Sequence, residues 1–179
     1  MLYLIRHGEA AASWGNHPDP GLSDLGQAQA EAVAEELERH GIRQIVSSPM
    51  QRCRETAQPL ELRLGLEAVI SQAVSEIETP SGVSDRVLWL RGFMGGTWDN
   101  EARSHLSWRD TMLAHLLDMP DNTAVFSHFV AINAIVSKLQ NRPETRVFSP
   151  AYCSVTKLVR EGNSLKVQQL GSESTTRVL

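Results

Sequence analysis

An arginine and a histidine stand side by side where the first apolar run of the chain ends. Arg6, His7 and Gly8 follow the apolar residues 2–5. An imidazole can act as a nucleophile as well as an acid or base, and a guanidinium is well suited to phosphate. Gly8 has no Cβ atom, so it would let the backbone approach a phosphate closely and adopt a positive φ. The segment therefore predicts a phosphate site that contains a histidine.

Two later segments have the same form. Residues 46–57 contain a strand end, a turn and the start of a helix that carries Arg52, and residues 123–128 are a short apolar strand that ends in Ser-His. The carboxyl ends of parallel strands meet at one edge of a sheet, and open α/β sheets bind their ligands there. If the three strands are adjacent and parallel, His7, Arg52 and His128 meet in one crevice.

With these motifs in order, the chain resembles the histidine phosphatase superfamily, also called the phosphoglycerate-mutase-like family. The resemblance rests on Arg6-His7-Gly8-Glu9, the segment 22–30 that opens the first helix, Ser47-Ser48-Pro49 with Arg52 and Thr56-Ala57, and Ser127-His128. It implies that His7 becomes a phosphohistidine during turnover. It also implies that Arg6, Arg52 and His128 complete the phosphate pocket, and Gly8 and Ser13 are assigned to phosphate binding with them.

The family also uses a carboxylic acid, which protonates the leaving oxygen and later activates water. Glu76 is the preferred candidate because it follows directly after a strand predicted to end near Val74, and Glu78 is the alternative two residues further on. An acid in this role must be protonated in the first step, so we expect its surroundings to raise its pKa.

Three positions depart from the family pattern. Phe129 follows the second histidine where glycine is common, and its ring is expected to narrow the pocket or alter the turn. Ala10 stands where Thr or Ser is frequent, and Ser13 stands where mutase-like members have asparagine. Ala10 and Phe129 resemble the short protein-phosphohistidine phosphatases, whereas an acid near Glu76 resembles the small-molecule phosphatases.

The leading functional hypothesis is hydrolysis of phosphomonoesters through a phosphohistidine intermediate, without a cofactor. The alternatives are a protein phosphohistidine phosphatase, a phosphoglycerate-type mutase and a catalytically impaired phosphate-binding protein. The short stretch between Glu76 and His128 leaves little chain for the cover with which mutases exclude water. No metal is expected, because the key histidines have no close His, Cys or Asp partners in the sequence and the neighbouring arginines would repel a cation.

Composition is that of a soluble globular protein, and the acidic charge with a few local arginines suits a small phosphorylated ligand. The 179 residues suit a single domain, 1–179, and a net charge of −4 with a pI near 5.9 does not indicate a nucleic-acid partner. No apolar run is long enough for a membrane helix, and the first strand leaves no room for a signal peptide, so we expect a cytoplasmic protein. The expected partner is a phosphorylated small molecule or a phosphohistidine protein.

Cys53 and Cys153 are expected to be free thiols, with a lowered thiol pKa conceivable for Cys53 beside Arg52.

The pattern of apolar residues predicts strands alternating with helices, and therefore a three-layer α/β/α sandwich whose mostly parallel sheet has an antiparallel edge. Strands are expected over residues 2–5, 44–47, 66–74 and 124–127, with a terminal hairpin of residues 154–159 and 165–170 that turns at Gly162-Asn163. Helices are expected over residues 24–40, starting at Ser23 as N-cap, and over 50–64, 106–117 and 130–139.

Two segments outside this pattern should shape the site. The polar loop 11–21 is long for a strand-to-helix connection, which is typical of a ligand-binding loop. Residues 75–103 combine glycines with aromatic residues, so they form either a lid over the site or an irregular packed excursion. Other polar residues have plainer expectations: Arg54 lies at the surface, Glu9 supports the site or pairs with an arginine, and His17, His40, His105 and His115 are solvent-exposed or loop-bound.

Overall fold

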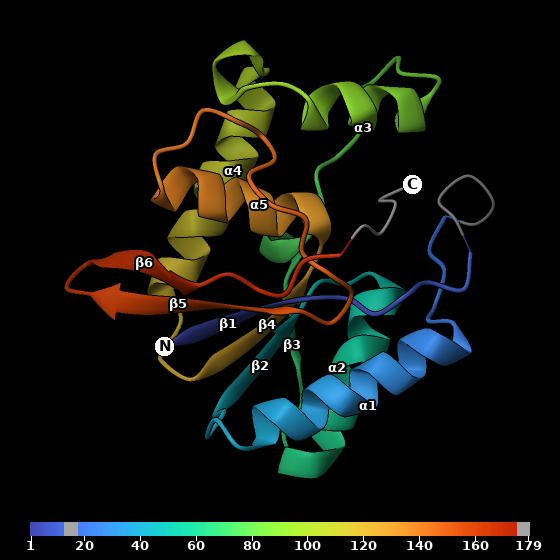
Figure 1. The fold of residues 1–179 in the computed structure, drawn as a ribbon, viewed down its shortest axis with the longest axis vertical. Coiled ribbons are helices and arrows are strands. Elements are labelled where there is room, and N and C mark those ends of the chain that lie inside the picture. Colours follow the sequence, from blue (N-terminus) through green and yellow to red (C-terminus); the bar gives the residue numbers. More distant parts are fainter. Residues whose placement is uncertain (13–17, 175–179) are drawn as a thin grey trace.

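The computed structural model describes residues 1–12 and 18–174, and its centre is one mixed sheet (Figure 1). The strand order is β3-β2-β4-β1-β5-β6. The strands are β1 (Leu2–Arg6), β2 (Gln44–Ser47), β3 (Val69–Ile70), β4 (Thr123–Ser127), β5 (Val155–Glu161) and β6 (Ser164–Gln169). The first four in the spatial order pair in parallel, and β5 and β6 are antiparallel, which confirms the expected antiparallel edge.

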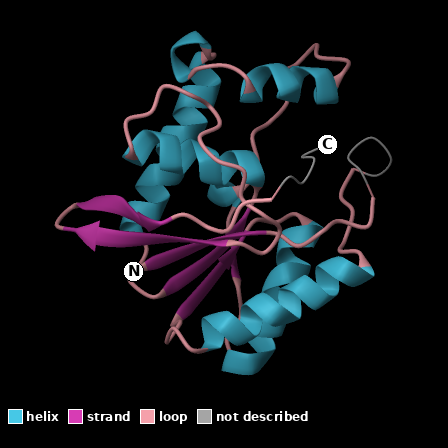
Figure 2. Ribbon diagram, viewed as in Figure 1, coloured by secondary structure: helices cyan, strands magenta, loops and turns pink. Residues whose placement is uncertain are grey.

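Helices cover both faces of this sheet, as Figures 1 and 2 show. On one face lie α1 (Asp24–Glu38) and α2 (Gln51–Leu64), and on the other lie α4 (Arg103–Asp118) and α5 (Phe129–Leu139). The short helix α3 (Arg86–Met94) lies further out on the α4 and α5 side, and the 3₁₀ turns are η1 (Gln72–Val74) and η2 (Trp98–Asn100). The predicted three-layer α/β/α sandwich is therefore confirmed. No helix in the described ranges is long and apolar enough to cross a membrane.

Local sequence signals set several element ends. Ser23 caps α1 as predicted, with its hydroxyl accepting the Gly26 N–H at 3.0 Å. Helix α2 ends at Gly65, whose φ of 65° is the left-handed conformation that favours glycine at a helix C-terminus. The hairpin turns where predicted, because Gly162 has a φ of 59° between β5 and β6.

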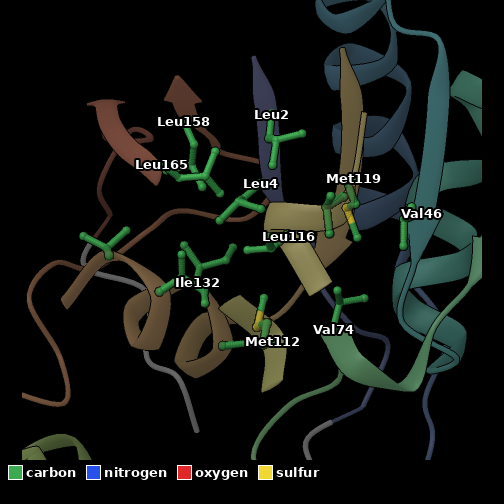
Figure 3. Packing of buried hydrophobic residues seen from close by; sticks show 14 of the residues in the cluster. Leu2, Leu4, Val46, Val74, Met112, Leu116, Met119, Ile132, Leu158 and Leu165 are labelled. Atoms are coloured by element: carbon green, nitrogen blue, oxygen red, sulfur yellow. The ribbon is translucent and has the colours of Figure 1, made fainter. Parts of the chain in front are cut away.

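The core consists of two apolar layers, one on each face of the sheet. Alternate residues of β1 enter the two layers: Leu2 and Leu4 face α4 and α5, while Tyr3 and Ile5 face α1 and α2. Figure 3 shows the first layer, in which Leu2 and Leu4 lie near Leu116 and Ile132. Strands buried on both faces are expected where helices cover both sides of a parallel sheet. This packing fixes the strand ends from which the site is built.

The predicted strand over residues 66–74 is wrong in its length. Only Val69 and Ile70 pair with β2, and they lie at the sheet edge with side chains 52% and 49% exposed. The backbone then turns into η1, where Ser75 N–H donates to the Gln72 carbonyl. The apolar side chain of Val74 is buried by this turn and not by strand alternation. The segment still ends beside the other strand ends, because Ser127 Oγ donates to the Val74 carbonyl at 2.7 Å.

Residues 75–103 form a packed excursion, the second of the two expected alternatives. Its buried side chains join the start of α5 in one apolar cluster: Ile77, Leu90, Phe93, Trp98, Phe129, Val130 and Ala134. Trp98 is also anchored by a hydrogen bond from its Nε1 to Ser137 Oγ at 2.8 Å. The excursion is thus attached to the body of the fold by its core.

The expectation for the remaining histidines is wrong at two positions on α4. His105 is buried, with its Nδ1 2.8 Å from Glu101 Oε2, and His115 is half-buried, with its Nε2 3.0 Å from Ser71 Oγ. Both lie on the inward side of a helix, which the sequence did not separate from its exposed side. His40 is half-buried in a turn beside Tyr3, and His17 lies outside the described residues.

Candidate functional site

Three parallel strand ends meet at one edge of the sheet, as the sequence predicts. Arg6 is in register with Ser127, and Ser47 with Phe126. The His7 N–H donates to the Ser127 carbonyl at 3.1 Å. The residues that follow the strands, His7, Ser48 and His128, consequently lie side by side.

The His7 ring is held as a neutral imidazole with a defined tautomer. Its Nδ1 lies 2.7 Å from the Gly8 carbonyl oxygen, which can only accept, so Nδ1 carries the proton. Its Nε2 accepts the Arg52 Nε–H at 3.2 Å. Burial, together with the charges of Arg52 and Arg6, lowers the pKa of His7 well below its usual value. The ring therefore has the unprotonated lone pair that a nucleophile needs on Nε2, where it accepts a hydrogen bond from Arg52.

His128 is a second neutral imidazole, with its ring centroid 5.4 Å from that of His7. Its Nδ1 lies 3.2 Å from Arg52 Nη2 and accepts from it, since a guanidinium can only donate. The proton is therefore on Nε2, 2.8 Å from Ser48 Oγ. Burial first and Arg52 second lower the pKa of His128 well below its usual value. The protonated form of His128 is thus disfavoured in this state.

Arg52 links the two histidines from the first turn of α2. Its side chain is 3% exposed, and it donates to one nitrogen of each ring. Asp19, in the loop before α1, completes an ion pair with it at 3.9 Å. Arg54 is exposed two positions along the helix, as expected.

Arg6 contacts two aromatic rings. Its Cζ is 3.9 Å from the Tyr152 ring centroid and 5.1 Å from that of Phe129. Its Nη1 donates to the Pro150 carbonyl at 2.9 Å. Phe129 is therefore a buried neighbour of this guanidinium, and the backbone before it is ordinary, since His128 is extended at φ −129°. Phe129 therefore does not alter the backbone turn, and no glycine is needed at this position.

Glu76 is the buried carboxyl group at the start of α5, and Glu78 is exposed. The Glu76 carboxylate accepts three backbone N–H groups, those of Val130 at 3.0 Å, Ala131 at 2.9 Å and Ile77 at 3.0 Å. Burial raises its pKa, while these hydrogen bonds and Arg52 act in the opposite direction. The surroundings of Glu76 thus agree with those expected for a general acid.

A cavity of about 530 Å³ opens beside Glu76 and Arg52. Its other lining residues are Pro18, Met50, Gln72, Ser75, Ile77, Glu78, Thr79 and Arg86. The half-buried Arg86, at the start of α3, donates through Nη2 to the Ile77 carbonyl at 3.3 Å. Sequence reasoning missed Arg86 and Tyr152, because neither belongs to a motif and each reaches the site only through long-range packing.

The positive φ expected at Gly8 is wrong, while its assignment to phosphate binding stays a prediction. Its φ is not positive, and its N–H donates to Thr56 Oγ1 at 3.0 Å. A Cβ atom at Gly8 would lie 2.7 Å from the Gly26 carbonyl oxygen, so glycine is required here by the close approach of α1. Ser13, also assigned to phosphate binding, lies outside the described residues.

The contacts of Cys53 and Glu9 support the fold around the site. The fully buried Cys53 thiol donates to the Ser127 carbonyl at 3.4 Å, and burial raises its pKa in spite of Arg52, so the lowered value considered from the sequence is wrong. Cys153 is also a free thiol, and burial raises its pKa to about 12.

Glu9 accepts the Ser23 hydroxyl at 2.8 Å and so supports the start of α1. Within residues 1–12 and 18–174, no three His, Cys, Asp or Glu side chains are arranged to hold a metal ion.

Comparison of the sequence with known proteins shows which ones this chain is similar to. The family model described as "Histidine phosphatase superfamily (branch 1)" matches residues 2–81. The chain is 29% identical over 165 residues to "Probable phosphoglycerate mutase GpmB" of Escherichia fergusonii, covering 80% of this chain and 76% of that protein. The protein of the same name from Enterobacter sp. (strain 638) is 27% identical with the same coverage.

Solved structures share the fold over nearly the whole chain. A mycobacterial glucosyl-3-phosphoglycerate phosphatase superposes with a TM-score of 0.74 at 22% identity, covering 96% of this chain and 99% of that chain. A phosphoserine phosphatase from Entamoeba histolytica superposes with a TM-score of 0.76 at 22% identity, covering 96% of each chain. At this level of identity the likeness concerns the fold.

Proposed function

We propose that the chain is a histidine phosphatase, the superfamily whose model matches residues 2–81, and that it hydrolyses phosphomonoesters through a phosphohistidine at His7. One observation carries the proposal: the His7 ring is neutral, and its proton is fixed on Nδ1 by the Gly8 carbonyl. The nucleophilic lone pair on Nε2 therefore lies beside the buried cation of Arg52. This is the arrangement that attack on a phosphoryl group requires.

In the first step, His7 Nε2 attacks phosphorus and the bond from phosphorus to the ester oxygen breaks. Glu76 gives its proton to that oxygen as the alcohol leaves. In the second step, water attacks the phosphohistidine, its proton passes to the Glu76 carboxylate, and the P–N bond breaks to restore His7. The Nδ1–H bond to the Gly8 carbonyl persists through both steps and stabilises the positively charged phosphorylated ring.

Positioned cations supply most of the stabilisation in such a reaction, because negative charge is spread over the phosphoryl oxygens. In the proposed complex, the Arg52 N–H groups that now donate to the two histidines donate to these oxygens instead. Arg6, at the end of β1, contributes a second positive charge. The anion then favours protonation of His128 Nδ1, which becomes a further donor. Each of these groups is already buried in place before the substrate arrives.

Small phosphorylated molecules are the proposed substrates. The cavity of about 530 Å³ beside Glu76 has the size of a typical small-molecule site and would hold the leaving group. The proposal includes a single domain over residues 1–179 and residence in the cytoplasm, where free cysteines such as Cys53 and Cys153 are usual. A mutase is the second candidate, favoured by the name of the bacterial relatives.

Phosphate release from a panel of purified phosphomonoesters tests the proposal. We expect release from alkyl and aryl phosphates in wild-type protein and none in His7→Ala. Conversion of 3-phosphoglycerate to its isomer without net phosphate release would favour the mutase. Activity confined to a phosphohistidine protein would favour the protein phosphatase. Absence of any turnover, with phosphate still bound, would indicate a phosphate-binding protein.

A further inference from the structure

Tyr152 is an aromatic residue that the proposed mechanism does not use, yet it touches both reactive residues at the end of β1. Its ring centroid lies 3.9 Å from Arg6 Cζ and 5.9 Å from the centroid of the His7 ring. The side chain is half-buried, so the ring borders both the site and the solvent. The residue belongs to the loop before β5, far from every motif of the site in sequence.

The backbone around Tyr152 is fixed on both sides. Cys153 N–H donates to the Arg6 carbonyl at 3.0 Å, and Ala151 N–H donates to the Ser172 carbonyl at 2.8 Å. Cys153 has a φ of 54°, a left-handed conformation that is uncommon for a residue with a side chain. Such a conformation persists where the surroundings determine it strongly. The loop therefore presents the Tyr152 ring to Arg6 in a defined position.

The guanidinium of Arg6 contacts two aromatic rings and has one buried nitrogen without a hydrogen-bond partner among the described residues. The Phe129 ring centroid lies 5.1 Å from Cζ, and the Pro150 carbonyl accepts from Nη1. Nε is buried and has no hydrogen-bond partner in the described part of the chain. A ring stacked on a guanidinium does not use the N–H groups, because they lie in the guanidinium plane. The Tyr152 side chain also forms a hydrogen bond with Arg6, and within the described ranges Nε remains the nitrogen without a partner. A buried donor without a partner is unfavourable unless a ligand accepts from it.

We propose that Tyr152 is a positioning residue, whose ring fixes the plane of the Arg6 guanidinium so that its Nε–H is available to a phosphoryl oxygen. The inference rests on the proposed function, since it assumes that phosphate binds beside Arg6. Without the ring, the guanidinium loses the contact on one face and can rotate. Phosphate affinity then falls although every phosphate ligand is still present.

Inorganic phosphate is the probe, measured as a competitive inhibitor of p-nitrophenyl phosphate hydrolysis and by calorimetry. We expect Tyr152→Leu to weaken phosphate binding about tenfold, a loss between those that correspond to an exposed and to a fully desolvated cation–π contact. Tyr152→Phe keeps the aromatic face and is expected to stay within about twofold of wild type. Equal weakening by both variants would overturn the inference, because the hydroxyl and not the ring face would then matter.

A double-mutant cycle separates positioning from direct contact with substrate. In the Arg6→Ala background, we expect Tyr152→Leu to change phosphate affinity less than about twofold, because there is no guanidinium left to position. The same tenfold loss in both backgrounds would contradict the proposal. A wild-type protein that neither binds phosphate nor hydrolyses p-nitrophenyl phosphate would overturn the proposed function itself, and this inference with it.

A measurement on unmutated protein covers the case in which Tyr152→Leu does not fold. The ¹⁵Nε–¹H resonance of Arg6, assigned by its absence in Arg6→Lys, is expected to shift on addition of inorganic phosphate. An unchanged resonance at saturating phosphate would show that this donor does not reach the anion, and would refute the inference.

Discussion

Replacing Arg52 by glutamine removes the charge that lies between the two histidines while keeping an amide donor. Arg52 is 3% exposed and donates to His7 Nε2 and His128 Nδ1, each at 3.2 Å. In the proposed transition state these N–H groups meet phosphoryl oxygens. Loss of a single donor of this type costs about 10²–10³ in kcat, or about 2.7–4 kcal/mol. We expect Arg52→Gln to reach the upper part of this range, because a full buried charge is lost as well.

The same substitution has a pH signature. The charge of Arg52 helps burial to lower the pKa of His7, so its removal raises that pKa. Because His7 attacks only when neutral, the acidic limb of the kcat/KM profile is expected to move to higher pH in Arg52→Gln. Arg52→Lys keeps the charge, so its limb stays near that of wild type, although kcat falls because lysine lacks the planar fork.

Stopped-flow or steady-state hydrolysis of p-nitrophenyl phosphate across pH measures both effects. Arg54→Gln is the matched control, because Arg54 is exposed on the same helix, and we expect its profile to superimpose on that of wild type. A kcat of Arg52→Gln within about threefold of wild type would refute the assignment of Arg52 to the phosphoryl group. An unmoved acidic limb would refute the electrostatic link to His7.

Three further predictions concern the acid, metals and packing. Glu76→Gln should greatly reduce hydrolysis of alkyl phosphates, whose alkoxides need a proton, and spare p-nitrophenyl phosphate, while Glu78→Gln should change neither; the reverse pattern of rates would make Glu78 the acid. EDTA should leave phosphate release unchanged, because the proposed clamp consists of side chains, and loss of activity restored by a divalent ion would contradict the mechanism. Gly8→Ala should lower the free energy of unfolding, measured in urea, by about 1–3 kcal/mol, because its Cβ would meet the Gly26 carbonyl. The control Gly92→Ala, on the exposed face of α3, should raise the free energy of unfolding by up to about 1 kcal/mol. Equal effects of the two substitutions would show that the contact at Gly8 is relieved without strain.

The architecture and the meeting of three strand ends could be predicted from the sequence because local sequence patterns indicate both. Short apolar runs that end in Arg6-His7 and Ser127-His128 define strand ends, and parallel pairing alone then brings them together. The predicted strand over residues 66–74 failed for the opposite reason. An edge segment with alternating residues becomes a strand only as far as a neighbour pairs with it, and β2 ends opposite Ile70.

The finer parts of the site depend on long-range packing. The sequence favours Glu76 over Glu78 only by its nearness to a strand end, whereas the packing of α5 buries Glu76 and supplies two of its three N–H donors. Arg86 and Tyr152 reach the site through the packed excursion and the loop before β5, neither of which carries a motif. The packing role of Gly8 could not be seen in the sequence, because the atom that would meet its Cβ is in α1, far along the chain.

The phosphorylated state of His7 is the central claim, and rapid-quench trapping tests it directly. The protein is mixed with a ³²P-labelled phosphomonoester, quenched in base within milliseconds, and digested to locate the label. We predict acid-labile, base-stable phosphate on the peptide that contains His7, formed and lost at rates compatible with turnover, and none in His7→Ala. Undiminished label in His7→Ala, or turnover without any labelled protein, would contradict the account.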